Sequence, residues 1–373
     1  MTLHIFNPEH DTALASGLAN FTAPHAGRQL HGDLAFLPAL WASDGDAVLA
    51  DDPSRARRRS GRRPVAAVAY VDRSQLRRLP IERIDPWGWD ASLVAFLLRQ
   101  GVDPALLPTP AMVDNIRSLS HRRTAMKLLD KLAELPGTVG QAFECDRREQ
   151  VEQLLERHGQ LVLKAPWSSS GRGLRFLDKE RVQLDADGLP LGDTPLGRWF
   201  RNIVAAQASV MVEPCYAKVK DFGMEFLADG NGGVNYQGLS LFHTKNGAYY
   251  GNILATEAAK LQLLSRYVDQ GTIQQLAQAV CTFAAQLLPR YQGPFGVDMM
   301  VVAGDQAIPA PATELRVRRF LIHPCVEVNL RRTMGHVALS VEQRVNSSAD
   351  PDLLHVMRID YTDHNYRLRI NRL

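Results

Sequence analysis

The stretch from Leu161 to Leu174, LVLKAPWSSSGRGL, constrains the fold of this chain more than any other. It begins with an apolar run that carries one lysine, Lys164, and this pattern predicts a buried strand that holds a cation rigidly. Small residues follow, and the backbone N–H groups of such a loop can approach an anion closely. Arg172, within the loop, adds a planar donor fork for phosphate oxygens. The stretch therefore indicates a phosphate-binding strand and loop, although an edge-strand lysine that reaches water fits the same pattern.

Length and composition limit the class of protein. At 373 residues the chain exceeds what one hydrophobic core usually holds, so roughly two or three lobes are expected. A net charge of +3 is too small to indicate a polyanion partner, and nucleic-acid binding is disfavoured. The arginine-rich run from Ser54 to Pro64 is typical of a solvated, mobile loop. The 4 cysteines are scattered without a C-x-x-C pair, which predicts reduced thiols rather than disulfides or a zinc ribbon.

The compartment follows from what the sequence lacks. The first residues, MTLHIFNPEHD, turn polar too early for a signal peptide, and no apolar run approaches membrane-spanning length. We therefore expect a cytoplasmic protein without a membrane partner. The oligomeric state stays open, and a homodimer is compatible with the sequence.

The first part of the chain has the pattern of an open α/β lobe. Buried, parallel-type strands are predicted at Leu3–Phe6, Ala47–Ala50 and Val65–Val71. A helix is predicted from Asp90, as N-cap, to Arg99, with Gly101 just past its end.

An early loop after the first strand gathers polar side chains: Glu9, His10, Asp11, His25 and His31. In open α/β sheets, ligands bind at the carboxyl ends of strands, where this loop begins. A helix start capped at Asp11, with the histidines on the surface, is the alternative that we favour for this loop.

Two helices are predicted before the Lys164 strand. The first runs from Asn115 to Leu132 and ends ahead of Pro136 and Gly137. The second runs from Asp146 to Gly159, with Asp146 and Glu149 as a capping box.

A long β-meander is predicted after the strand Ala208–Val212, with turns at Gly230–Gly233 and at Asn246-Gly247. Within it, the segment DFGMEFL alternates apolar with acidic residues, so Asp221 and Glu225 are expected to face water or a ligand. An amphipathic helix, Thr272–Leu288, follows the meander and stops at a proline.

Acidic residues recur inside two apolar strands near the C-terminal end. Asp298 is the one charged residue of GVDMMVV, and Glu327 and Asn329 lie two apart in FLIHPCVEVNL. A hairpin across the loop Ala307–Thr313 would put all three on one face, and such hard oxygen ligands suit Mg²⁺. A solvated sheet face is the alternative, but Arg331 and its neighbour place positive charge where a phosphate would need it.

Taken together, these pieces resemble the ATP-grasp superfamily, in motif order from Ser118 to His336. The resemblance implies an α/β and α+β protein with an N-terminal open α/β lobe, of the pre-ATP-grasp type, over residues 1–118. A two-subdomain ATP-grasp fold would follow, with the glycine-rich loop in residues 119–214 and the metal-binding sheet in residues 215–373.

The resemblance also implies an ATP site with Mg²⁺, or alternatively Mn²⁺. Glu213 and the backbone near Cys215 would meet adenine, Asp221 would meet ribose, and Asp298, Glu327 and Asn329 would hold the metal. The phosphates would be held by the lysine, by the flexible loop and by an earlier position that many members occupy with lysine: Lys164, Ser169, Ser170, Gly171, Arg172, Gly173 and His121.

Two positions depart from the family pattern. Many members have an arginine two residues before the first metal aspartate, where this chain has Gly296, so Arg331 becomes the candidate catalytic cation beside Lys164 and Arg172. His121 replaces the earlier phosphate lysine.

The chemistry that the resemblance implies is the joining of a small-molecule carboxylate to an amine through an acyl phosphate. Two alternatives stay open: a kinase that phosphorylates a small molecule, and a nucleotide-binding protein without catalysis. We expect the substrate between the N-terminal lobe and the sheet, near His10, His243, Lys245 and Asn252, although each of these also fits an ordinary surface position.

Overall fold

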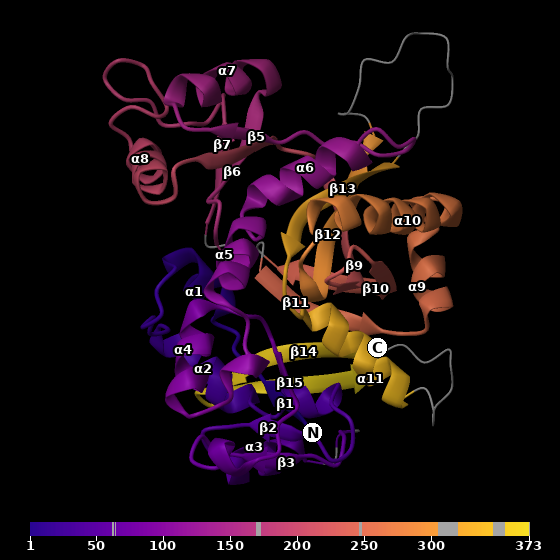
Figure 1. Ribbon diagram of the computed structural model, residues 1–373. Coiled ribbons are helices and arrows are strands. Elements are labelled where there is room, and N and C mark those ends of the chain that lie inside the picture. The colour runs from indigo at the N-terminus through magenta and orange to yellow at the C-terminus, as the bar shows by residue number, and fades with distance from the viewer. Residues whose placement is uncertain are drawn as a thin grey trace.

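The computed structural model describes residues 1–61, 63, 65–168, 173–245, 248–304, 320–345 and 355–372. Within these residues the strands form three sheets, and helices cover them (Figure 1). Two sheets have 4 strands each and the third has 7. The model is therefore a mixed α/β and α+β structure, as the sequence predicts.

The N-terminal sheet is parallel and has the order β3-β2-β1-β4. Its strands and helices are β1 (Thr2–Ile5), α1 (His10–Ser16), α2 (His25–Leu34), β2 (Ala47–Leu49), α3 (Pro53–Ser60), β3 (Ala69–Val71), β4 (Arg83–Pro86) and α4 (Ala91–Arg99). The predicted open α/β lobe is confirmed. Asp90 caps α4 by accepting the N–H of Leu93, as predicted. The third strand is shorter than predicted, because it begins only at Ala69.

The arginine-rich run lies in helix α3 as far as Ser60, so the prediction of a mobile loop is wrong there. Asp52 caps α3 by accepting the N–H of Arg55. Arg55 and Arg59 pair with the buried Asp33, and both donate to Asn365 near the C-terminal end. These contacts with distant segments hold the run in place.

The second sheet is antiparallel, with the order β5-β8-β6-β7. This part of the chain contains α5 (Pro110–Leu119), α6 (Arg122–Leu132), β5 (Phe143–Cys145), α7 (Arg148–His158), β6 (Gln160–Lys164), β7 (Leu174–Asp178), α8 (Pro195–Gln207) and β8 (Val210–Pro214). The lysine strand β6 is thus confirmed, and it is central in its sheet.

Two details of the predicted helices are wrong. The helix expected from Asn115 to Leu132 is split, because His121 is extended and its Nδ1 caps α6 by accepting the N–H of Arg123 at 3.0 Å. The capping box of α7 is also different. Gln150 Oε1 accepts the N–H groups of Asp146 and Arg147, each at 3.0 Å.

The seven-stranded sheet is antiparallel, with the order β13-β12-β9-β10-β11-β14-β15. It contains β9 (Lys218–Asp229), β10 (Val234–Lys245), β11 (Ala248–Leu254), β12 (Gln292–Ala303), β13 (Phe320–Asn329), β14 (His355–Thr362) and β15 (Asn365–Arg372). Its helices are α9 (Glu257–Leu264), α10 (Gln270–Leu287) and α11 (Met334–Val345). The predicted turn at Asn246-Gly247 and the loop Ala307–Thr313 lie outside the described residues.

Both faces of strand β9 are buried in its middle, from Phe222 to Phe226. Phe222, Met224 and Phe226 point into the largest core, which the alternation in the sequence predicts. Glu225, expected to face water or a ligand, is instead 3% exposed. It accepts a hydrogen bond from Thr333 Oγ1 at 2.8 Å and lies 2.9 Å from His336 Nδ1, so the start of α11 covers it.

The C-terminal strands pack against the N-terminal lobe (Figure 1). Phe36 and Leu37 share a hydrophobic core with Met357 and Leu368. The two ends of the chain therefore pack together, and the loop after β1 is brought toward the end of β13. The division at residues 118 and 214 stays a prediction. Among the described helices, none is long and apolar enough to cross a membrane.

We predict that Phe226→Ala lowers the free energy of unfolding by about 3–5 kcal/mol, because it opens a cavity in the main core. The Phe226 ring is fully buried and stacks on Phe295 with a centroid distance of 5.1 Å. Urea unfolding of both variants measures the effect. Phe176→Ala is the control, because the Phe176 side chain is 71% exposed. Equal losses in the two variants would contradict this account of the core.

Candidate active site

The three candidate metal ligands lie together on strands β12 and β13. The antiparallel register places Asp298 opposite Glu327 and Gly296 opposite Asn329. Asn329 Nδ2 donates a hydrogen bond to Asp298 Oδ2 at 3.1 Å. The hairpin pairing that the sequence predicts thus brings two carboxylates and an amide side by side.

This arrangement is short of positive charge around Asp298. Burial, followed by the neighbouring Glu327 and Glu225, raises the pKa of Asp298 to about 8. Among the described residues there is no group of three or more His, Cys, Asp or Glu side chains that could hold a metal, and the third donor here is the amide of Asn329. Two carboxylates and an amide oxygen are hard donors that suit a small divalent cation, and the raised pKa of Asp298 shows that the nearby Arg331 does not offset its burial and the neighbouring carboxylates.

Gly296 leaves no space for the arginine that many ATP-grasp proteins have at its position. A Cβ atom there would lie 2.7 Å from Glu225 Oε2 and 2.8 Å from Thr333 Cγ2. The buried Glu225 therefore occupies the volume that a larger side chain would need.

Lys164 is buried at the end of β6 and reaches the strand that carries Glu327. Its Nζ atom lies 2.6 Å from Glu213 Oε1 and donates to the backbone oxygen of Val326 at 3.3 Å. Gly173 marks the return of the loop to β7, and its backbone oxygen accepts the N–H of Ala165. The predicted phosphate-binding residues between them, Ser169, Ser170, Gly171 and Arg172, lie outside the described residues.

Arg122 was assigned no role from the sequence. Its NH2 atom donates to Glu327 Oε1 at 2.8 Å, and its Nε atom donates to the backbone oxygen of Ala165 at 3.1 Å. Arg122 thus links the lysine strand to the candidate metal ligands. Its position, next to the residue that aligns with the family's phosphate lysine, was the available signal.

His121, the residue predicted to contact phosphate, caps α6 instead of facing the metal ligands. Its ring also packs edge-on against Trp167, with centroids 4.5 Å apart. Burial and the nearby Arg123 lower the pKa of His121 to about 4. Of the consecutive residues His121 and Arg122, it is Arg122 whose side chain reaches Glu327.

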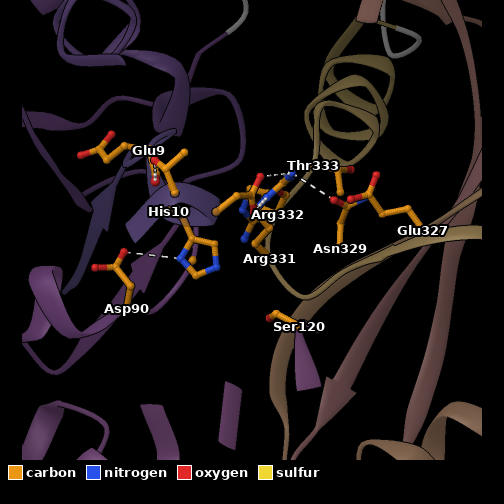
Figure 2. Close-up of polar contacts among 12 residues, drawn as sticks. Glu9, His10, Asp90, Ser120, Glu327, Asn329, Arg331, Arg332 and Thr333 are labelled. Atoms are coloured by element: carbon orange, nitrogen blue, oxygen red, sulfur yellow. Dashed lines mark hydrogen bonds and ion pairs between the residues drawn. The ribbon is translucent and has the colours of Figure 1, made fainter. Parts of the chain in front are cut away.

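Arg331 is held by Asp11, which lies in the first turn of α1. Two hydrogen bonds of 2.8 Å each join its guanidinium to the Asp11 carboxylate. A third, of 3.0 Å, reaches Asn329 Oδ1 (Figure 2). Burial would raise the pKa of Asp11, but the guanidinium outweighs it and lowers this pKa. The predicted helix start is present, but α1 begins at His10 without a cap from Asp11, and His10 is buried rather than on the surface. The start of this helix thus lies at the site, and Asp11 was not identified as a partner from the sequence.

The residues predicted to meet adenine and ribose each contact other parts of the protein. Glu213 pairs with Lys164 and lies 3.9 Å from the buried His323. The backbone N–H of Cys215 donates to Gln160 at the start of β6. Asp221 is bonded to Lys218 at 2.7 Å and to Thr244 at 2.6 Å.

Two cavities adjoin these residues. A cleft of about 1010 Å³ has walls from the N-terminal lobe and from the large sheet, including Trp87, Arg290 and Arg331. A small cavity of about 20 Å³ lies beside Glu327 and Asn329. His10 lines the small cavity, whereas His243 and Asn252 line neither. Asn252 is buried in the sheet, where it donates to Ser240.

No protein-family model and no curated protein matches this sequence. Solved structures do match the fold. The biotin carboxylase domain dimer of Hydrogenobacter thermophilus 2-oxoglutarate carboxylase, in complex with MgADP, ADP and bicarbonate, is 12% identical, with a TM-score of 0.53 over 97% of this chain and 75% of that chain. A Campylobacter jejuni biotin carboxylase–β,γ-ATP complex is 12% identical, with a TM-score of 0.51 over 98% and 77%.

A Staphylococcus aureus N5-carboxyaminoimidazole synthetase complexed with ADP is also similar, at 12% identity over 96% of this chain and 82% of that chain. Its TM-score is 0.47. The two biotin carboxylases establish that this chain has the ATP-grasp fold, as the motifs predict. At this level of identity the likeness concerns the fold alone.

We predict that acid destabilises the protein partly through His323, whose pKa burial lowers to about 4. The unfolded chain takes up a proton near pH 6.5 and the folded chain does not, so this stabilisation is complete above pH 6.5 and is lost as the pH falls toward 4. Between pH 7 and 4, the wild type should therefore lose about 3 kcal/mol more unfolding free energy than His323→Phe.

Urea unfolding at several pH values measures this difference. His25→Asn is the control, because His25 is exposed. If the loss on acidification is the same in wild type and His323→Phe, the neutral buried imidazole is not its cause.

Proposed function

We propose that this protein is an ATP-dependent ligase that joins a carboxylate to an amine through an acyl-phosphate intermediate. One observation carries the proposal: the buried Lys164 and the partly buried Arg122 contact β13 beside Asp298, Glu327 and Asn329. Cations next to hard oxygen donors are what binding of a metal-bound triphosphate requires. The fold shared with biotin carboxylases, one of them bound to MgADP, supports the same proposal.

The residues have distinct roles in this proposal. Asp298, Glu327 and Asn329 hold Mg²⁺, which neutralises the charge of the β- and γ-phosphates when it is bound. Lys164 contacts the phosphates, and the loop Ser169–Gly173 with Arg172 covers them. Glu213, the backbone of Cys215 and Asp221 contact the nucleoside.

Arg331 acts on the reacting carboxylate. Asp11 holds its guanidinium in a fixed, bidentate geometry, so little reorganisation is needed when charge develops. Arg331 also lines the cleft of about 1010 Å³, where we place the acid and the amine. A substrate oxygen attacks the γ-phosphorus as ADP leaves, and the amine then attacks the acyl carbon as phosphate leaves.

We predict that Glu327→Gln lowers ADP release about 10³-fold, because one charge that holds the metal is lost. The assay is a screen of ADP release from MgATP with pools of amino acids, small carboxylic acids and amines. Glu134→Gln is the control, because Glu134 is exposed and lies away from the cleft. Undiminished activity in Glu327→Gln would remove Glu327 from the mechanism.

The products of the same screen separate the alternatives. A ligase gives ADP, phosphate and an amide, whereas a kinase gives ADP and a stable phosphorylated acceptor. ATP binding without turnover in any pool would indicate a non-catalytic protein.

We predict that ATP raises the melting temperature only when Mg²⁺ is present, and that Lys164→Met reduces this rise. The lysine contributes direct phosphate contacts, and ligand binding to the folded state stabilises it by mass action. Thermal unfolding, with and without ATP, Mg²⁺ and EDTA, measures the shift of each variant from its own baseline. Lys179→Met is the matched control, because Lys179 pairs with Glu156 at the surface. The assigned site would be contradicted if ATP raised the melting temperature equally with and without Mg²⁺ and equally in wild type and Lys164→Met.

A further inference from the structure

The first turn of α1 contributes a second residue, besides Asp11, to this region. His10 begins α1, and it is 1% exposed. Its side chain lines the cavity of about 20 Å³ whose walls also include Ser120, Glu327 and Asn329 (Figure 2). A cavity of this size holds about one water molecule or one amino group. An imidazole thus shares a small polar cavity with two of the proposed metal ligands.

The position of His10 is fixed by the backbone beneath it. A Cβ atom on Gly88 would lie 2.7 Å from both Nε2 and Cε1 of the ring and 2.8 Å from Cδ2. The flat face of the imidazole therefore lies directly on the backbone of residue 88, and only glycine allows this contact. Any side chain at Gly88 would displace the ring.

Asp90 lies behind the imidazole and is itself held rigidly. Its Oδ1 atom accepts the N–H of Leu93 at 2.9 Å, and its Oδ2 atom accepts from Asn7 Nδ2 at 3.1 Å. The same Oδ2 lies 3.4 Å from Nδ1 of His10, as the dashed line in Figure 2 shows. This contact falls short of a hydrogen bond, and Nδ1 is buried without a partner. A small movement would close it, as is common for catalytic pairs before the substrate binds.

A purely structural role explains these features poorly. A buried ring nitrogen without a hydrogen bond costs stability, and a histidine kept only for packing would be replaced without loss by an apolar residue. The imidazole instead lies between a buried carboxylate and a small polar cavity. This arrangement orients a proton acceptor.

We infer that His10, backed by Asp90, accepts the proton of the attacking amine in the second step of the reaction; this role rests on the proposed ligase function. The amine nitrogen forms a bond to the acyl carbon, and the bond from that carbon to the phosphate oxygen breaks, with its electron pair leaving on phosphate. The ammonium proton moves to Nε2 of His10, and Asp90 stabilises the imidazolium. The first step does not use His10, because the attacking carboxylate is already ionised.

The test compares two nucleophiles on the same acyl phosphate. Wild type, His10→Asn and Gly88→Ala receive MgATP, a pool of amino acids and small carboxylic acids, and either hydroxylamine or a pool of primary amines. Hydroxylamine, unlike a primary amine, is largely unprotonated at neutral pH, so it attacks without first giving up a proton, and the proton released after attack can pass to water. Hydroxamate formation therefore reports the first step with little demand on a protein proton acceptor. Amide formation reports both steps.

We expect His10→Asn to lower amide formation about 10²–10⁴-fold while hydroxamate formation stays close to that of wild type. Gly88→Ala should also lower amide formation and leave hydroxamate formation close to that of wild type, because it keeps the imidazole but displaces it. Asp90→Asn, which keeps a capping oxygen for α4, should lower amide formation alone. Retained hydroxamate formation also shows that each variant is folded. His25→Asn, at an exposed histidine, is the control and should match wild type.

The outcomes separate this role from the proposed function. Parallel loss of hydroxamate and amide in His10→Asn would show that His10 supports the structure or the first step, and would overturn the inference. Unchanged amide formation would overturn it as well. If wild type forms no hydroxamate and releases no ADP with any pool, the ligase function itself is refuted and the role of His10 with it.

Discussion

The site depends on two carboxylates that the sheet forces together. Asp298 and Glu327 are cross-strand partners, and like charges in that position repel, more strongly when they are buried. The fold compensates by bringing cations from separate elements to the same place. Arg122 comes from the start of α6, Lys164 from the end of β6 and Arg331 from the end of β13. The packing of these elements on one another is thus tied to the charge balance of the site.

The same end of β13 also attaches the N-terminal lobe. Arg331 and Arg332 are consecutive, and each holds a carboxylate of that lobe: Asp11 after β1, and Asp85 on β4 at 3.0 Å. The guanidinium of Arg332 also lies 4.5 Å from the ring of Trp41. A buried, bidentate arginine pair fixes direction as well as distance. The lobe is therefore docked with the loop after β1 against the candidate metal ligands, and the apolar core that it shares with β15 holds it there.

Much of this could be predicted where the relevant pattern is local. The period of two in β13 places Glu327 and Asn329 on one face, and the alternation in β9 identifies Phe222 and Phe226 as core residues. The predictions that were wrong mostly depend on partners far along the chain. The burial of Glu225 depends on Thr333, 108 residues later.

The split between α5 and α6 has a different cause. Histidine is not among the residues usually preferred at an N-cap, so the cap that His121 provides gave no recognisable signal. The pairing of Asp11 with Arg331 spans 320 residues, and no composition or spacing reveals it. The loop after β1 could be recognised as unusual from its sequence, but its place at the site required the tertiary structure.

The contact between Arg122 and Glu327 has a consequence for ligand binding. Arg122 donates to Glu327 at 2.8 Å and to the backbone of Ala165 at 3.1 Å, so it neutralises one of the two carboxylates. A divalent cation bound to Glu327, as proposed, supplies that neutralisation itself and weakens the pull on the guanidinium. Arg122 would then be free to pair with phosphate oxygens that arrive with the metal, while its bond to Ala165 keeps it near the lysine strand. Metal and nucleotide binding are coupled in this scheme, because the same arginine satisfies the carboxylate in one state and the phosphate in the other.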